Sequence, residues 1–230
     1  MSTSAEQITD LIAGNAALKT FFEGERAALE SARADLPGLI SIVAYVDEVN
    51  GLPGSDGTLA KPYASIDAAL VAARPGQQYE IRLLSNANLT ARYFRNGETL
   101  RLVGWAAGGG YQLRDLTIAG ASSNHPSQPA GMGLSGFVWF SNIRLIMPSG
   151  ASVVGFLSSY SFLGIGFADC EIIGTVGSTP LIEGSIGTFG IGLNNTVITD
   201  MEGRWVRGFA SGVALTADTC GGLIDPAITN

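Results

Sequence analysis

Acidic side chains are the residues of this chain that could carry out a reaction, because cleavage of a polysaccharide requires paired carboxylates or a metal beside a basic group. The candidates lie in the second half of the chain: Asp115, Asp169, Glu171, Glu183, Asp200 and Glu202. Asp115 and Asp169 hold equivalent places in an internal repeat, where a turn explains them. The sequence does not show that any two of the six are neighbours in space. We therefore predict no catalytic residue and a protein that is not an enzyme.

The sequence does not favour a metal or redox site. The loop from Asp47 to Gly57 offers oxygen ligands for calcium, but it lacks the alternating acidic residues and final glutamate of an EF-hand. Cys170 and Cys220 lack the paired spacing of a zinc or redox motif, and His125 lies in a polar loop sequence. We predict no metal, no cofactor, buried cysteines and a solvent-exposed histidine.

Composition restricts the partners of the chain. Of its 230 residues, 46% are hydrophobic and 14% are charged, so the chain must bury a core. The formal net charge of −7 argues against binding a nucleic acid. Residues 145–168 carry no charge and are long enough to cross a bilayer, but their proline, glycines and serines argue against membrane insertion. The start of the chain lacks the pattern of a secretory signal, which predicts synthesis in the cytoplasm.

The opening segment, residues 1–38, has a character of its own, since it is charged and poor in glycine. Ser4 and Gln7 have the spacing of a helix capping box, and Pro37 ends the helix. A heptad repeat counted from Ile8 predicts a short, imperfect coiled coil that docks onto a particle or trimerises. The mostly apolar residues at its seam are Ile8, Leu11, Asn15, Leu18, Phe22, Leu29 and Leu36. The alternative is an amphipathic helix packed on its own domain or on a docking partner.

Residues 39–78 are predicted to form a first strand, a loop and a capping helix. The branched and aromatic run over residues 40–46 is typical of a strand. A loop rich in turn-forming residues follows. Ser65 then caps a short helix that Pro75 and Gly76 end, and residues 79–84 again resemble a strand.

A repeat organises residues 79–230. Its unit is a short phrase with a large apolar residue first, Asp or Asn third and an aliphatic residue sixth. The phrases are Leu113–Ile118, Phe140–Leu145, Phe167–Ile172 and Leu193–Ile198, and the spacing between their starts is nearly constant. We predict one solenoid turn per repeat, with the third residue at a tight turn in the left-handed region. A β-sandwich or a mixed β domain is the alternative.

The segment from Tyr45 to Leu70 resembles the opening module of pectate-lyase-like right-handed parallel β-helices in bacteriophage tail spikes and tail fibres. The residues that carry the resemblance are Asp47, Gly54, Asp56, Gly57, Pro62, Tyr63 and Ile66. The resemblance implies a mainly β fold, in which a right-handed parallel β-helix (β-solenoid) is preceded by an N-terminal α-helical anchor or short coiled coil. The leader also resembles the start of tail-fibre or head-spike proteins of phages and gene transfer agents.

This resemblance implies a structural fibre or spike subunit of a virion, made in the cytoplasm of a bacterial host. The expected partners are two further copies in a homotrimer, other virion proteins and host cell-surface polysaccharide. Five aromatic residues could stack on sugar rings, although ordinary packing also explains them: Trp105, Tyr111, Trp139, Tyr160 and Trp205. The alternatives are a polysaccharide depolymerase and a structural adaptor that carries a separate receptor-binding protein.

Overall fold

The computed structural model describes residues 4, 12–26, 41–74, 76–149, 154–158, 161–174, 179–183, 188–201, 204–207 and 223–224, with only the backbone at 95–98 and 223–224. The chain divides into two compact units, Met1–Ile40 and Ser41–Asn230, and each is described by itself. Several predicted residues lie outside the described ones: Ile8, Leu11, Leu29, Leu36, Tyr160, Glu202 and Cys220.

The described part of the first unit is a helix over residues 12–26. All of its side chains are exposed, including Leu18 and Phe22 on the predicted seam and the neighbouring Phe21. The rings of Phe21 and Phe22 meet edge to face, with centroids 5.7 Å apart. The predicted helix is confirmed over these residues, and its apolar side chains are exposed to solvent.

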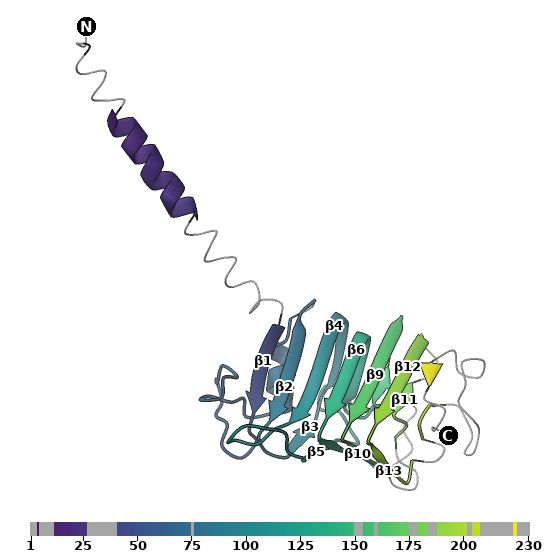
Figure 1. Cartoon of the computed structure of the whole chain (residues 1–230). Helices are drawn as coiled ribbons and strands as arrows, with labels where there is room; N and C mark the ends of the chain where they lie inside the picture. The colour runs from purple at the N-terminus through teal and green to yellow at the C-terminus, as the bar shows by residue number, and fades with distance from the viewer. Residues whose placement is uncertain are drawn as a thin grey trace. The chain divides into compact units, whose positions relative to one another are not determined.

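The second unit is built from parallel strands in two sheets (Figure 1). The large sheet contains β1 (Ser41–Val46), β2 (Gln78–Leu83), β4 (Arg92–Gly104), β6 (Gly131–Ser141), β9 (Phe162–Ala168), β12 (Thr188–Asn194) and β14 (Leu223–Ile224), with β8 (Leu157–Ser158) and β11 (Ile182–Glu183) off this path. The small sheet contains β3 (Ala87–Leu89), β5 (Arg114–Ile118), β7 (Ile143–Ile146), β10 (Glu171–Ile173) and β13 (Val197–Thr199). We call a layer one strand of the large sheet together with the strand of the small sheet that follows it in the chain, as in β2 and β3, β4 and β5, β6 and β7, β9 and β10, and β12 and β13.

Alternation along the strands builds the core, because successive side chains of a strand point to opposite faces. A buried row crosses the large sheet through the register partners Ala44, Ile81, Leu102, Phe140 and Phe167. The rings of Phe140 and Phe167 stack with centroids 4.9 Å apart. The small sheet adds a row through Leu116, Leu145 and Ile172 to the same cluster. Both sheets therefore share one core.

Short corners join the two sheets in the later layers. Asn142, Asp169 and Asn195 occupy these corners in the left-handed region, with φ of 53°, 54° and 46°. Asn and Asp tolerate this conformation better than other non-glycine residues. The Asn195 Nδ2 also donates a 2.6 Å hydrogen bond to the Asp169 carboxylate of the layer before. The predicted tight turn at the third residue is confirmed in these three phrases.

The first phrase is an exception. Asp115 lies inside β5 instead of at a corner, and Leu116 pairs with Leu145, so the phrase is offset by two positions from its predicted alignment. The cause is the loop over residues 105–113, which separates β4 from β5, whereas Asn142 alone separates β6 from β7. An insertion at this corner shifted the predicted phrase away from its structural equivalent.

The predicted right-handed parallel β-helix (β-solenoid) is wrong. The described strands form two parallel sheets, and no closed solenoid is found among the described residues. The segment over residues 119–130, which leads from β5 back to β6, consists of bends and turns instead of a strand. The described strand pairings are all parallel, so the alternative of an antiparallel sandwich also fails.

The helix α2 (Ile66–Ala72) packs on the first layers, as predicted for the capping helix. The Ser65 Oγ accepts a hydrogen bond of 3.1 Å from the Ala68 amide and caps the helix. Ile66 is fully buried. The carboxylate of Asp67 accepts hydrogen bonds from the Thr90 amide and hydroxyl and from the Tyr93 hydroxyl, so it ties the helix to the start of β4.

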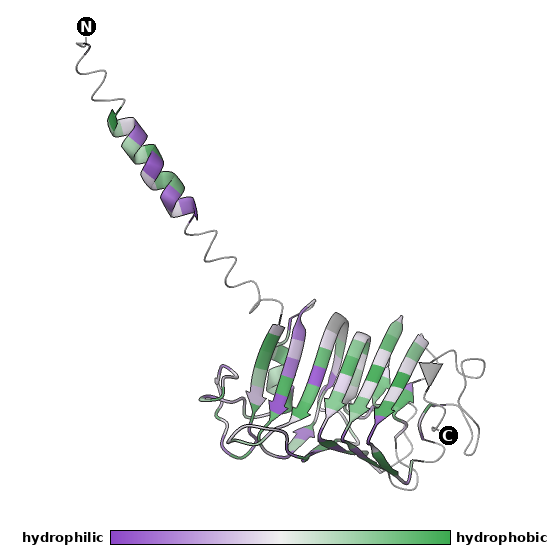
Figure 2. Ribbon diagram, in the orientation of Figure 1, coloured by the Kyte–Doolittle hydropathy of each residue, from purple (hydrophilic) through white to green (hydrophobic). Residues whose placement is uncertain are grey.

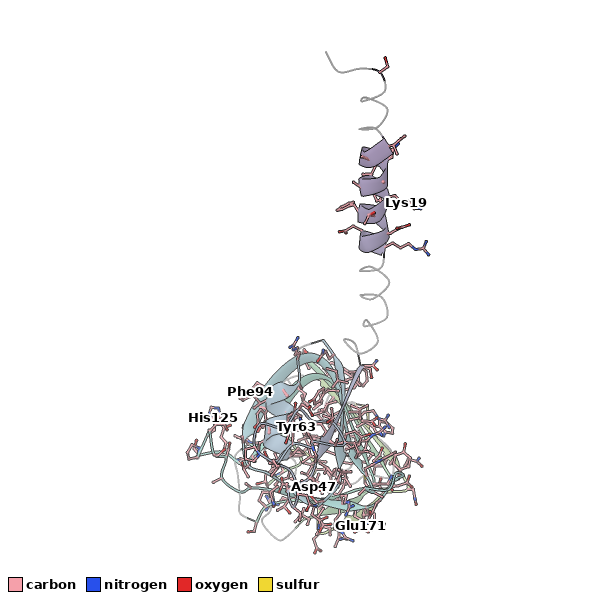
Figure 3. All side chains as sticks on the ribbon, turned by 90° about the vertical axis from the view of Figure 1, so that its left-hand side faces the viewer. Lys19, Asp47, Tyr63, Phe94, His125 and Glu171 are labelled. Carbon is pink, nitrogen blue, oxygen red and sulfur yellow. The ribbon has the colours of Figure 1, made fainter. Side chains whose placement is uncertain are left out.

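The loop before α2 is closed by its own hydrogen bonds. The Asp47 carboxylate accepts from the Val49 and Asn50 amides, while the Asp47 amide donates to the Tyr63 carbonyl at 2.9 Å (Figure 3). Burial acts to raise the pKa of Asp47, but the hydrogen bonds from Asn50 and Val49 outweigh it and lower the pKa. Gly57 has φ of +79°, and a Cβ there would overlap the Tyr63 ring.

The remaining residues of the predicted module lie in the same loop. Gly54 has a positive φ of 77°, and the Asp56 carboxylate accepts hydrogen bonds from the Thr58 amide and hydroxyl, while Pro62 directly precedes Tyr63.

The described part of residues 145–168 belongs to β7, β8, β9 and their links. Among the described residues, there is no helix with the length and apolar character needed to span a membrane.

Candidate binding site

The outward-facing side chains of the large sheet differ in polarity and size from strand to strand. Two outward rows follow the register. One contains Val43, Glu80, Arg101, Trp139, Gly166 and Gly192, and the other contains Ser41, Gln78, Thr99, Phe137, Gly164 and Gly190. Figure 2 shows the change as purple segments on β2 and β4 and as green and white segments on β6, β9 and β12. The face is polar on β2 and β4 and aromatic on β6. On β9 and β12 it is bare backbone at the glycines of the two rows, with Phe162 at the start of β9.

Three aromatic side chains form one wall of a groove on this face. Phe137, Trp139 and Phe162 are 57%, 40% and 41% exposed, which is unusual for large rings in one patch. The Phe137 and Phe162 rings meet edge to face with centroids 5.6 Å apart. The Trp139 indole Nε1 donates a 2.9 Å hydrogen bond to the Ser141 hydroxyl, which fixes the orientation of the ring.

Glycines form the floor of the groove. The Phe137 ring lies over Gly164, and the Trp139 ring lies over Gly166, so closely that a Cβ at either glycine would come within 3 Å of ring atoms. The next strand continues the floor with Gly190 and Gly192, and a Cβ at Gly192 would meet nothing within 4 Å. The groove has a volume of about 320 Å³. Its open part lies over β12, next to the glycines that the two rings cover.

A second, polar hollow lies on the same face over β1, β2 and β4. It has a volume of about 80 Å³, and its lining includes Gln78, Glu80, Thr99 and Arg101. The Glu80 carboxylate pairs with Arg82 Nε at 2.7 Å and with Arg101 Nη1 at 2.8 Å. Burial acts to lower the pKa of Arg82, but the hydrogen bond and charge of Glu80 outweigh it and raise the pKa. The Arg82 guanidinium therefore stays charged.

The aromatic residues predicted to bind glycan do not gather in one place. Trp139 alone lines the groove, whereas Trp205 is 3% exposed and belongs to the core, as the packing alternative expects. Trp105 and Tyr111 meet edge to face with centroids 5.3 Å apart, and the Arg82 guanidinium lies 4.0 Å from the centre of the Trp105 ring. These two residues form a separate cluster held by a cation–π contact.

Ion pairs and hydrogen bonds hold the carboxylates that were considered as catalytic candidates. Arg144 lies between Asp115 and Glu171 and pairs with both, at 3.0 Å from Asp115. The hydrogen bond with Glu171 is the main cause of the raised pKa of Arg144. Glu183 is buried and pairs with Arg207 at 2.8 Å.

Asp200 is the last candidate carboxylate among the described residues. It lies at a positive φ of 55° directly after β13. The described residues hold no group of three or more His, Cys, Asp or Glu side chains that could bind a metal ion.

The remaining reactive side chains agree with their predicted environments. Cys170 is buried, and this burial raises the pKa of its thiol. His125 is exposed, with its ring edge-on to Phe94 at 6.2 Å between centroids (Figure 3).

Sequence reasoning missed most of the groove: Phe137, Phe162, Gly164, Gly166, Gly190 and Gly192. The signal was present, because Gly-Ile-Gly occurs at residues 164–166 and again, one repeat later, at residues 190–192. Glycine at alternate positions of a strand leaves one face of that strand without side chains.

No family model, no curated protein and no solved structure matches this chain.

Proposed function

We propose that the chain is a structural, non-enzymatic subunit of a fibre or spike on a phage-like particle, and that its aromatic groove binds glycan on the host surface. The observation that carries the proposal is the exposed wall of Phe137, Trp139 and Phe162 above a floor of glycine. A sugar ring has an apolar face, and a flat aromatic ring offers it a large apolar surface at low cost in side-chain entropy.

The size of the groove supports a small ring as its occupant. A volume of about 320 Å³ lies at the lower end of the range of about 300–1,000 Å³ that small-molecule sites occupy. Because the floor has no side chains, a ring can lie flat against the backbone beside Trp139.

Trp139→Ala tests the glycan-binding role directly. We expect the variant to bind host polysaccharide at least about fivefold more weakly, because removal of one stacked ring costs on the order of 1 kcal/mol or more. The matched control is Tyr111→Ala, since Tyr111 is 63% exposed and lies outside the groove. Isothermal titration calorimetry with purified host polysaccharide measures both variants. Equal affinities for wild type and Trp139→Ala would refute the role of the groove.

The absence of enzymatic turnover is tested separately. Host polysaccharide incubated with the protein should release no new reducing or unsaturated ends, because Arg144 and Arg207 hold Asp115, Glu171 and Glu183 in ion pairs. If ends appear and Glu171→Gln abolishes them, the protein is a depolymerase and this part of the proposal fails.

The helix over residues 12–26 supports a homotrimer. Leu18 and Phe22 are more than half exposed, and they are spaced as seam positions of a coiled coil, with the polar Asn15 on the same seam. Copies of this helix would cover these side chains. A trimeric leader also suits attachment to a particle, as the resemblance of the opening residues implies.

Phe22→Glu tests the trimer, because a charge on the seam opposes association. The control is Thr20→Glu, which adds the same charge to the opposite face of the same helix. Light scattering should give three chains for the wild type and the control and one chain for Phe22→Glu. A wild-type monomer would exclude this mode of assembly.

A further inference from the structure

A cluster of three charged side chains beside the groove, Arg82, Glu80 and Arg101, carries a net positive charge. Two guanidinium groups, Arg82 and Arg101, share the single carboxylate of Glu80, which leaves one positive charge on this part of the face. The whole chain has a net charge of −7, so this positive site is opposite in sign to the rest of the protein. The side chain of Arg101 is 42% exposed, so solvent and ligands can reach it.

The register places this charge directly beside the aromatic wall. Arg101 on β4 is the register partner of Trp139 on β6, and Thr99 is the partner of Phe137. Neighbouring strands lie about 4.8 Å apart, and these residues occupy the same face of the sheet. The Arg101 guanidinium has five N–H donors, and its ion pair with Glu80 is made through Nη1. An anionic group could therefore approach Arg101 while a ring attached to it lies on Trp139.

We propose that the site takes an acidic polysaccharide, and this inference rests on the proposed function of the groove. A sugar ring stacks on Trp139 over the glycine floor, and the carboxylate of a uronic acid residue binds the exposed donors of Arg101. Guanidinium and carboxylate match in geometry and charge. The saccharide chain crosses the strands, from the hollow on β2 and β4 over the Trp139 ring to the open floor on β12.

A matched pair of ligands tests the inference on the full-length protein. The probes are a uronic acid oligosaccharide and the same oligosaccharide with its carboxyl groups reduced to alcohols. We expect the acidic form to bind about tenfold more tightly or better at low salt. This preference should shrink as the salt concentration rises, because salt screens an exposed ion pair.

Variants separate the two parts of the site. Arg101→Gln should remove the preference for the acidic probe and leave the affinity for the reduced probe unchanged. Trp139→Ala should weaken binding of both probes. Arg74→Gln is the matched control, because Arg74 is exposed and lies outside both hollows. Circular dichroism of each variant confirms that it folds.

The failures of the two proposals are distinguishable. If Trp139→Ala weakens both probes but Arg101→Gln changes neither, the acidic preference is overturned and the glycan-binding groove stands. If the wild type binds neither probe nor host polysaccharide, the proposed function fails and this inference fails with it. If Trp139→Ala instead lowers the mass of the protein in light scattering, a second copy covers the groove and the glycan assignment is wrong.

Discussion

Gly166 and Gly192 offer a direct test of the aromatic groove, because they occupy the same outward row one strand apart and differ in what lies above them. A Cβ at Gly166 would come within 3 Å of the Trp139 ring, whereas a Cβ at Gly192 would meet open space. Neither glycine has a positive φ. The two alanine variants therefore differ in crowding and not in backbone strain.

Gly166→Ala must displace the Trp139 ring or shift the backbone beneath it. Overpacking of this kind costs about 1–3 kcal/mol. For a domain of about 150–250 residues each kcal/mol lowers Tm by about 2–4 °C, so the expected loss is about 2–12 °C. Gly192→Ala should instead raise stability slightly, by about 0.4–1 kcal/mol, because alanine restricts the unfolded chain.

Thermal unfolding and acrylamide quenching of tryptophan fluorescence measure the two effects. Gly166→Ala should lower Tm and make Trp139 more accessible to the quencher, while Gly192→Ala should leave quenching unchanged. Equal Tm values and equal quenching in the two variants would show that Trp139 does not lie over Gly166, and the geometry of the groove would have to be abandoned.

Three further predictions concern the loop before α2 and the corners between the sheets. Gly57→Ala should lower the free energy of unfolding in urea by about 1–3 kcal/mol, because the residue has a positive φ and faces the Tyr63 ring; an unchanged midpoint would contradict this. Asn142→Ala should cost about 1–2 kcal/mol while Asn142→Gly costs less, and equal losses would argue against a left-handed corner. The pKa of Asp47 in the folded protein is lowered from its ordinary value of 3.8, so the ionised carboxylate stabilises the fold at every pH above 3.8. This stabilisation is lost as the pH falls through the pKa of the folded state. Asp47→Asn should therefore flatten the acid limb of the stability curve, and an unaltered limb would refute the role of this carboxylate.

The sequence predicted local structure where one residue type has a single physical reason to be present. Ser65 begins α2 because its hydroxyl can satisfy a free amide of the first turn. Asn142, Asp169 and Asn195 occupy corners because a short polar side chain tolerates the left-handed region. The spacing between these three corners also predicted which strands pair.

Two kinds of information were missing from the sequence pattern. The loop over residues 105–113 could not be recognised as an insertion at a corner, so Asp115 was aligned with the corner residues although it belongs to β5. The grouping of the strands into sheets was also predicted wrongly, because periodicity shows that layers repeat but does not show which links between strands become strands themselves.

The groove was missed for a different reason. Aromatic residues were considered one by one, but Trp139 gains its role from a register partner that has no side chain. That partner, Gly166, lies a full repeat further along the chain, and only the pairing of β6 with β9 brings the two together. A search for glycines that repeat with the period of the layers would have identified the floor.

The nearly constant length of chain from β6 to β9 and from β9 to β12 has a consequence for how such a gene can change length. Phe140 pairs with Phe167, and Phe167 in turn pairs with Leu193, so each step along this row uses almost the same stretch of sequence. An in-frame duplication of one such stretch would supply a new strand for each sheet, with its own corner and its own share of the interior. Because each layer contacts mainly its neighbours, the added copy would meet surfaces that already match it. Unequal recombination between the repeats could thus lengthen or shorten the protein in steps of one layer without the redesign of either end.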